Sequence, residues 1–197
     1  MDMNTDALDR QDMAELVAGR DQALDRLMDR YGEKIFRFLL RTLPSEHDAA
    51  EIAHETFVRV YERKQQFKPE KRFSSWLFQI ALNLARDRFR RIGRAKEVSL
   101  DTGLTEGGDA LGGWARDDSA DPSAALESRE RGEIVRNAIE ALPEELRLPV
   151  ILAEYEGLSH SEIAEILDCS AKAVEMRIYR ARKALRTSLK DVFSPTP

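Results

Sequence analysis

The stretch LSHSEIAEILDCSAKAVEMRIYRARKALR, residues 158–186, has the pattern of a helix, a tight turn and a second helix. Ser159 and Glu162 form a predicted capping box, in which each side chain accepts a hydrogen bond from the other's backbone amide. Asp168 tolerates the left-handed backbone that a sharp turn often needs. Ser170 can cap the helix that follows. The stretch therefore predicts a helix-turn-helix.

The second helix of this motif has two different faces. The face expected to pack is apolar and consists of Val174, Ile178, Ala181 and Leu185. The opposite face carries Lys172, Met176, Tyr179 and Lys183, with Glu175 and Arg180 on its flanks. From Lys172 to Lys190 the only acid is Glu175, although the whole chain has a net charge of −5. Positive charge concentrated on one helix favours DNA binding in the major groove over a merely solvated basic face.

Composition limits the class of protein. With 197 residues and 42% hydrophobic content, the chain can form one large or two small domains. No run of about 18 apolar residues is present and the N-terminus is acidic and polar, so we expect a cytoplasmic protein without membrane span or signal peptide. The single cysteine, Cys169, excludes an internal disulfide, and the histidines (His47, His54 and His160) form no metal-ligand pattern. No metal or other cofactor is expected.

The predicted fold class is all-α, with two small helical domains joined by a flexible acidic linker. Residues 7–95 are rich in helix formers with 3.6-residue apolar periodicity. Residues 96–124 are rich in glycine and acids and poor in large apolar side chains, which is typical of a linker. Residues 125–193 are helical again and include the helix-turn-helix.

Within residues 7–95, a long helix is expected to end at Pro44, and Ser45 is expected to open the next one. The side of this second helix opposite its apolar stripe carries Asp48, Glu51 and Glu55 at spacings of three and four residues. We call these three residues the acidic ridge. It is available to a partner.

The following block, FSSWLFQIALNLARDRFRRIGR (residues 73–94), interleaves aromatic and basic side chains. Aromatic rings beside cations are typical of single-stranded DNA binding, because bases stack on the rings and phosphates pair with the cations. Part of the pattern, including Trp76 and Leu77, also has the spacing of a helix core. From Lys71 to Arg94, however, Asp87 is the only acid.

Four blocks of the chain together resemble an extracytoplasmic-function (ECF) RNA polymerase sigma factor of the sigma-70 family, of the RpoE-like kind. The blocks are DAAEIAHETFVRVY (48–61), FSSWLFQIALNLARDRFRR (73–91), LPEELRLPVILAEYEGLSHSEIAEIL (142–167) and AVEMRIYRARKAL (173–185). The resemblance implies a non-enzymatic factor that binds core RNA polymerase and directs promoter-specific initiation, reading −35 and −10 elements and melting DNA. Residues 7–95 would be sigma region 2 and residues 125–193 sigma region 4.

The resemblance also implies partners and site residues. The partners would be the β′ clamp helices and β flap of core polymerase, promoter DNA and an anti-sigma factor able to hold the protein at the membrane, with no small-molecule substrate. The process served would be a stress response. Core polymerase would be bound by Asp48, Glu51, Glu55 and Phe57. The −10 element would be bound by Gln66, Phe67, Lys68, Arg72, Trp76, Asn83, Arg86 and Arg90, and the loop from Gln65 through Ser74 would receive a flipped base. The −35 element would be bound by Lys172, Glu175, Met176, Tyr179, Arg180 and Lys183.

Some positions depart from the family's usual residues. Many members carry Gln where this chain has His54 and an acid where it has Ala50, which would retune polymerase docking. Glu175 and Met176 stand where Arg and Ser are frequent. A carboxylate accepts from cytosine N4 whereas Arg favours guanine, so we expect a different −35 sequence.

Three alternatives stay open at this stage. An ordinary helix-turn-helix repressor or response-regulator output domain would explain residues 158–186 but not the acidic ridge or the block at 73–91. A sigma-like adaptor could bind polymerase without opening promoters. An enzyme is disfavoured because the sequence shows no glycine-rich phosphate loop, metal cluster or Ser/His/Asp set.

Overall fold

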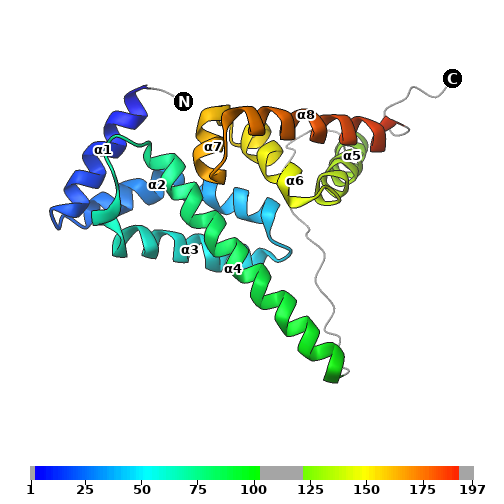
Figure 1. The fold of residues 1–197 in the computed structure, drawn as a ribbon, viewed down its shortest axis with the longest axis horizontal. Helices are drawn as coiled ribbons and strands as arrows, with labels where there is room; N and C mark the ends of the chain where they lie inside the picture. The colour runs from blue at the N-terminus through cyan, green and yellow to red at the C-terminus, as the bar shows by residue number, and fades with distance from the viewer. Residues whose placement is uncertain (1–2, 103–121, 191–197) are drawn as a thin grey trace.

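The computed structural model describes residues 3–102 and 122–190, and in this part of the chain all regular secondary structure is helical, without strands (Figure 1). The elements are α1 (Met3–Val17), α2 (Gln22–Thr42), α3 (Glu46–Glu62), the 3₁₀ turn η1 (Lys64–Gln66), α4 (Phe73–Thr102), α5 (Pro122–Glu140), α6 (Glu144–Val150), the π-helical turn η2 (Ile151–Tyr155), α7 (His160–Leu167) and α8 (Ala171–Ser188). The all-α prediction is confirmed.

The first four helices form an N-terminal unit around one apolar core. Helix α2 ends where Leu43 turns extended before Pro44, as the restricted backbone of a residue preceding proline requires. Ser45 then caps α3, because its hydroxyl accepts a hydrogen bond from the Asp48 amide at 3.3 Å. Both predictions are confirmed. Helix α4 closes the core from one side, with Phe78 meeting Phe38 edge-on at 5.2 Å between ring centroids.

A buried polar cluster joins α1 to α2. The Asp9 carboxylate is 1% exposed and accepts hydrogen bonds from the Tyr31 hydroxyl, at 2.6 Å, and from Arg30. Arg30 also pairs with Asp12 at 2.9 Å. Burial raises the pKa of Asp9, although the bonds from Tyr31 and Arg30 oppose the shift. The cluster therefore holds α1 in one register on α2, because any sliding would leave buried polar groups unpaired.

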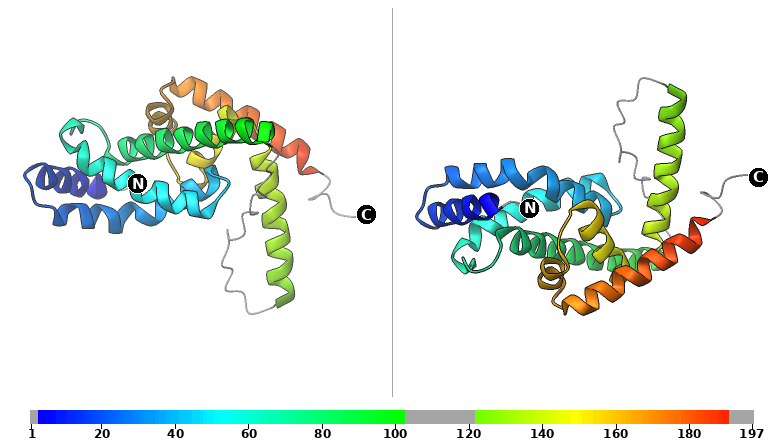
Figure 2. Two further views of the ribbon diagram at one scale, coloured as in Figure 1. Left: turned by 90° about the horizontal axis from the view of Figure 1, so that it is seen from below. Right: turned by 90° about the horizontal axis from the view of Figure 1, so that it is seen from above.

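The C-terminal unit, α5–α8, contains the helix-turn-helix with the capping that the sequence predicts. Ser159 and Glu162 form the capping box. Asp168 lies in the left-handed region with φ 50°, and the Ser170 hydroxyl accepts from the Ala173 amide. Upstream, Pro149 lies inside the helix and lacks a backbone N–H; the π-helical turn η2 follows directly. In Figure 2, α5 stands across the direction of α4.

The predicted domain boundaries differ from the observed helix ends. Helix α4 continues to Thr102 and α5 begins at Pro122, so both helices extend into the predicted linker of residues 96–124. Pro122 was read as a linker residue because glycines and acids surround it, but proline is also well suited to the first position of a helix. Residues 103–121 lie outside the described part of the chain, and the prediction of a flexible linker stays a prediction.

The two units also pack on each other, whereas the sequence predicts two small domains joined by a flexible linker. Helix α7 contacts α4, and η2 contacts α2. Buried residues of both units, such as Leu77 and Ile163, belong to one continuous hydrophobic core. We call this packing of α7 against α4 the closed arrangement.

The buried polar cluster gives a stability prediction. Replacing Asp9 with alanine should lower the free energy of unfolding by about 1–3 kcal/mol, because the buried Tyr31 hydroxyl loses its acceptor. Urea denaturation followed by circular dichroism measures the change. Asp29→Ala, an exposed change on α2, is the control and should alter stability by less than about 0.5 kcal/mol. Equal effects of the two substitutions would contradict the role given to Asp9.

Candidate nucleic-acid interface

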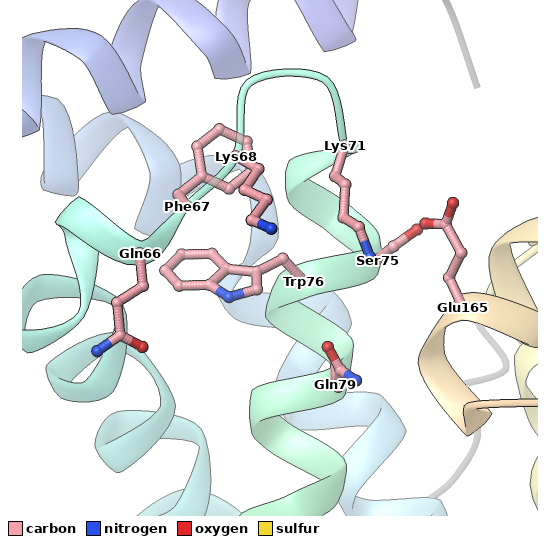
Figure 3. Close-up of a pocket in the computed structure, with 8 residues that line it drawn as sticks. All are labelled: Gln66, Phe67, Lys68, Lys71, Ser75, Trp76, Gln79 and Glu165. Carbon is pink, nitrogen blue, oxygen red and sulfur yellow. The ribbon is translucent and has the colours of Figure 1, made fainter.

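A pocket of about 190 Å³ lies where the loop after α3 meets the start of α4 (Figure 3). Its lining residues are Gln66, Phe67, Lys68, Lys71, Ser75, Trp76, Gln79 and Glu165. In Figure 3 the Trp76 indole lies beside the Phe67 ring, and Lys68 reaches over the indole. The ring centroids of Phe67 and Trp76 are 5.4 Å apart with their planes inclined at 46°.

Buried aromatic contacts hold this pair of rings in place. Phe73, the first residue of α4, is 2% exposed and lies 6.0 Å from Phe67 and 6.1 Å from Trp76, centroid to centroid. Tyr31 of α2 packs edge-on against Phe73 at 5.4 Å. Phe67 and Trp76 keep part of their surface accessible. They can therefore offer aromatic surface to a ligand without being reordered.

The polar groups of the pocket are hydrogen-bond donors and acceptors beside cations. Ser75 is 4% exposed, and within the described residues its hydroxyl has no hydrogen-bond partner. Gln66 and Gln79 add amide groups, and Lys68 and Lys71 add charge. A turn in which the Lys71 amide donates to the Lys68 carbonyl at 2.9 Å places both lysines before α4. Aromatic surface, amides and cations suit a nucleobase with its phosphate.

A polar stripe continues from the pocket along one face of α4. Spacings of three and four residues bring together Trp76, Gln79, Asn83, Arg86 and Arg90. Asn83 is exposed, Arg86 pairs with Glu144 at 2.9 Å, and Arg90 pairs with Asp87. The structure thus brings Gln66, Phe67, Lys68 and Trp76 together in the pocket and sets the rest of the predicted −10 residues of α4 in line with it.

Sequence reasoning missed some lining residues. Gln79 could have been found, because it falls on the helical spacing between Trp76 and Asn83. Lys71 falls within the predicted loop from Gln65 through Ser74, although it was not named as a −10 residue. Ser75 carries only a weak signal, since hydroxyl side chains are common near helix starts. Glu165 belongs to α7, distant in sequence, and nothing local predicts its place in this pocket.

The predicted −10 residue Arg72 lies at the same end of α4 but is already engaged. Its Nη1 donates to Glu162 Oε1 at 2.6 Å, and its Nε lies 3.3 Å from the Asp6 carboxylate. Hydrogen bonding to Glu162 raises the pKa of Arg72. Arg72 therefore joins α4 to α7 in the closed arrangement.

The acidic ridge on α3 is braced by arginines. Arg88 of α4 pairs with Asp48 and with Glu51, the latter at 2.6 Å, and Arg59 pairs with Glu55 at 2.9 Å. The Glu51 carboxylate stays about half exposed. Phe57, which was also predicted to bind core polymerase, is 4% exposed and lies in the core behind α3. Its part in polymerase binding stays a prediction.

Helix α8 presents the outward face that the sequence predicts. Val174, Ile178 and Ala181 are buried. Lys172, Met176, Tyr179, Arg180 and Lys183 are exposed. Tyr179 is 63% exposed, and Glu175 is held by an ion pair with Lys172 at 2.9 Å. This face can enter a groove of DNA with no change in the packing of the helix.

No cluster of three or more His, Cys, Asp or Glu side chains in residues 3–102 and 122–190 is placed to hold a metal ion. None of the helices in this part of the chain is long and apolar enough to cross a membrane.

Comparison with known proteins identifies both units. The Sigma-70 region 2 family matches residues 27–95, and the Sigma-70, region 4 family matches residues 132–185. The ECF RNA polymerase sigma-E factor of Escherichia coli (strain K12) is 35% identical over 182 residues, covering 92% of this chain and 94% of the relative. The RNA polymerase sigma-H factor of Pseudomonas aeruginosa is 32% identical over 194 residues, covering 96% and 98%.

Solved structures agree with this assignment. CnrH in complex with the cytosolic domain of CnrY superposes with a TM-score of 0.67 at 27% identity, over 95% of this chain and 99% of CnrH. The sigma factor RpoE of Bartonella quintana, solved with the anti-sigma factor NepR, has the same TM-score at 22% identity, over 84% and 96%, and supports the fold. The chain therefore belongs to the ECF sigma factors, the non-enzymatic subunits that direct RNA polymerase to specific promoters.

Proposed function

We propose that the pocket at the start of α4 captures a base of the −10 element that has left the duplex, and that this capture helps to melt the promoter. Removing a base from the stack costs a few kcal/mol, and stacking on an aromatic side chain returns about 1–3 kcal/mol per base. One observation carries the proposal: the pocket brings the rings of Phe67 and Trp76 together with Lys68 and the buried Ser75 hydroxyl. The stripe through Asn83 to Arg90 would take the rest of the strand.

The other two surfaces, the acidic ridge and the outward face of α8, would bind polymerase and the −35 element. The acidic ridge would dock on the β′ clamp helices, with Glu51 and Glu55 as its most accessible carboxylates. The outward face of α8 would read the −35 element in the major groove, and the C-terminal unit would contact the β flap. The protein would perform no chemistry itself and would act in the bacterial cytoplasm at the nucleoid. An anti-sigma factor is a proposed partner, because RpoE of Bartonella quintana was solved with the anti-sigma factor NepR.

A polymerase-independent repressor and an adaptor that cannot open promoters would behave differently from this proposal. Stable co-purification with core polymerase would exclude the first. Run-off transcription by the reconstituted holoenzyme would exclude the second.

Reversing the charge of the ridge should prevent docking on polymerase. We expect Glu51→Arg with Glu55→Arg to reduce core binding at least about tenfold, because two carboxylates become cations on the docking surface. Fluorescence anisotropy with purified core polymerase measures it. Asp25→Arg with Asp29→Arg, the same charge change at two exposed positions of α2, is the control and should bind normally. Near-wild-type binding by the double variant would contradict the docking assignment.

Removing the Asn83 amide should impair opening more than closed-complex formation. In Asn83→Ala the unpaired −10 strand loses a hydrogen-bonding group on the polar stripe, whereas duplex contacts of α8 persist. Permanganate reactivity of unpaired thymines follows opening, and a mobility shift at low temperature follows closed complexes. Gln22→Ala, an exposed amide change on α2, serves as control. Unchanged reactivity on several promoters would remove Asn83 from the site.

Two substitutions on α8 distinguish a residue that reads a base from one that only contacts phosphate. Glu175→Arg replaces the carboxylate that pairs with Lys172 by a guanidinium. The preferred −35 sequence should therefore change, with a difference in binding free energy of about 1–3 kcal/mol per affected base pair. Arg180→Ala should weaken all promoters alike and flatten the salt dependence by about one counterion unit, if Arg180 only contacts the backbone. Selection from a randomised −35 library gives the readout.

Glu140→Arg makes the same charge change at an exposed position on α5 and should leave the selected −35 motif unaltered. An unaltered motif for Glu175→Arg would mean that Glu175 carries no sequence information.

A further inference from the structure

Helix α4 begins without a side chain that can cap it. The Trp76 amide donates to the Arg72 carbonyl at 3.3 Å, which makes Arg72 the N-cap residue. A guanidinium carries only donors and cannot accept from the amides of the first turn. Serine hydroxyls, by contrast, cap α3, α7 and α8. The backbone amides of residues 73–75 therefore have no acceptor within their own helix.

The Ser75 hydroxyl adds a side-chain donor to the same turn. Ser75 is 4% exposed and lines the pocket, yet its hydroxyl has no hydrogen-bond partner within the part of the chain that the structure describes. A buried polar group without a partner costs free energy. A hydroxyl can turn its hydrogen towards whichever acceptor enters the pocket, so a ligand oxygen at this position would remove the cost.

Positive charge collects around this helix start. Lys68 and Lys71 line the pocket, and no ion pair holds either lysine within residues 3–102 and 122–190. Glu165 is the only acid among the lining residues. The N-terminal end of a helix is the positive end of the helix dipole, which disfavours nearby cations and favours an anion. The lysines and the dipole together therefore attract negative charge to the start of α4.

The two sides of the pocket differ in chemistry. In Figure 3 the rings of Phe67 and Trp76 lie on one side, and Ser75 lies beside the Lys71 ammonium on the other, with Glu165 of α7 beyond it. The aromatic side suits a base. The other side offers backbone amides, a hydroxyl and an ammonium group, which are the donors that bind phosphate at helix N-termini.

We infer that the start of α4 is a phosphate-binding subsite, in which the first-turn amides, the Ser75 hydroxyl and the Lys71 ammonium hold one backbone phosphate beside the captured base. The inference rests on the proposed capture of a −10 base by the pocket. A base held on the rings and a phosphate held at the helix start would fix one nucleotide at two points. Because a phosphate contact carries no base information, Ser75 would act on every −10 sequence alike.

The test measures binding of a fluorescent non-template −10 strand, taken from a promoter that the holoenzyme transcribes, to holoenzymes that contain wild-type or variant protein. Ser75→Ala should weaken binding about tenfold, because a hydrogen bond to a charged oxygen is lost. Ser161→Ala, the same atomic change at an exposed position of α7, is the control and should bind normally.

A methylphosphonate, which removes the charge of a single phosphate, locates the contact on the strand. Placed at each linkage in turn, it should weaken wild-type binding most at one linkage, and there it should have little further effect on Ser75→Ala. Lys71→Gln should show the same loss of sensitivity at that linkage and flatten the salt dependence by about one counterion unit. Lys34→Gln, the same charge change at an exposed position of α2, should do neither.

Stability separates a binding role of Ser75 from a structural one. Because its hydroxyl has no partner in the free protein, Ser75→Ala should leave the urea midpoint of unfolding unchanged or raise it. A hydroxyl that supports the fold would lower the midpoint together with the affinity for the strand. A lowered midpoint would therefore overturn the inference.

Trp76→Leu, measured in the same way, separates this inference from the function on which it rests. Weaker strand binding by Trp76→Leu, with wild-type affinities for Ser75→Ala and Lys71→Gln, overturns only the phosphate subsite. Equal effects of the methylphosphonate on wild type and both of these variants, at every linkage, do the same. Wild-type binding by Trp76→Leu overturns the proposed function of the pocket as well.

Discussion

Helix α4 contacts several neighbours, each through a different face set by the 3.6-residue helical period. The rest of the structure depends on which residues lie on each of these faces. Leu77 and Phe78 pack into the core of the N-terminal unit. Arg88 turns towards α3 and braces the acidic ridge. The stripe from Trp76 to Arg90 stays at the surface, and the first turn supplies the pocket and the contact with α7. A change in the rotation of α4 would disturb all of these contacts together.

The basic side chains are also distributed unevenly over the surface. The chain is acidic overall, with a net charge of −5, yet its cations gather at the pocket, on the α4 stripe and on α8. Several of them are paired with acids in the closed arrangement, including Arg72 with Glu162 and Arg86 with Glu144. The exposed pair of Arg86 with Glu144 brings little net stability, because side-chain ordering and solvent screening offset the Coulomb attraction. Exchange of Glu144 for a phosphate of the proposed −10 strand would therefore cost little.

Local features of the fold were predictable from sequence because they depend on neighbouring residues. The caps at Ser45, Ser159 and Ser170, the left-handed Asp168 and the two faces of α8 all follow from spacing within one or two turns. The end of α4 at Thr102 was not predictable, since glycine and acids nearby indicated a linker. Phe57 was assigned to a partner from the resemblance, and its burial in the core was not considered there.

The packing of the two units could not be foreseen. Glu162 and Arg72 are far apart in the chain, and each has an adequate local explanation, one as a helix cap and the other as a DNA-binding cation. Nothing in either segment indicates that they meet. The pocket is a similar case, because its aromatic and basic members are visible in the sequence but the wall formed by Glu165 is not.

The central claim is that the pocket at the start of α4 receives one unstacked base of the −10 strand. Its most direct measurement is a double-mutant cycle that combines Trp76→Leu, which keeps the site apolar, with an abasic substitution at each position of the non-template −10 strand bound to the holoenzyme. The account predicts a coupling free energy of about 1–3 kcal/mol at one position and none at positions away from it. Absence of coupling at every position would contradict the account.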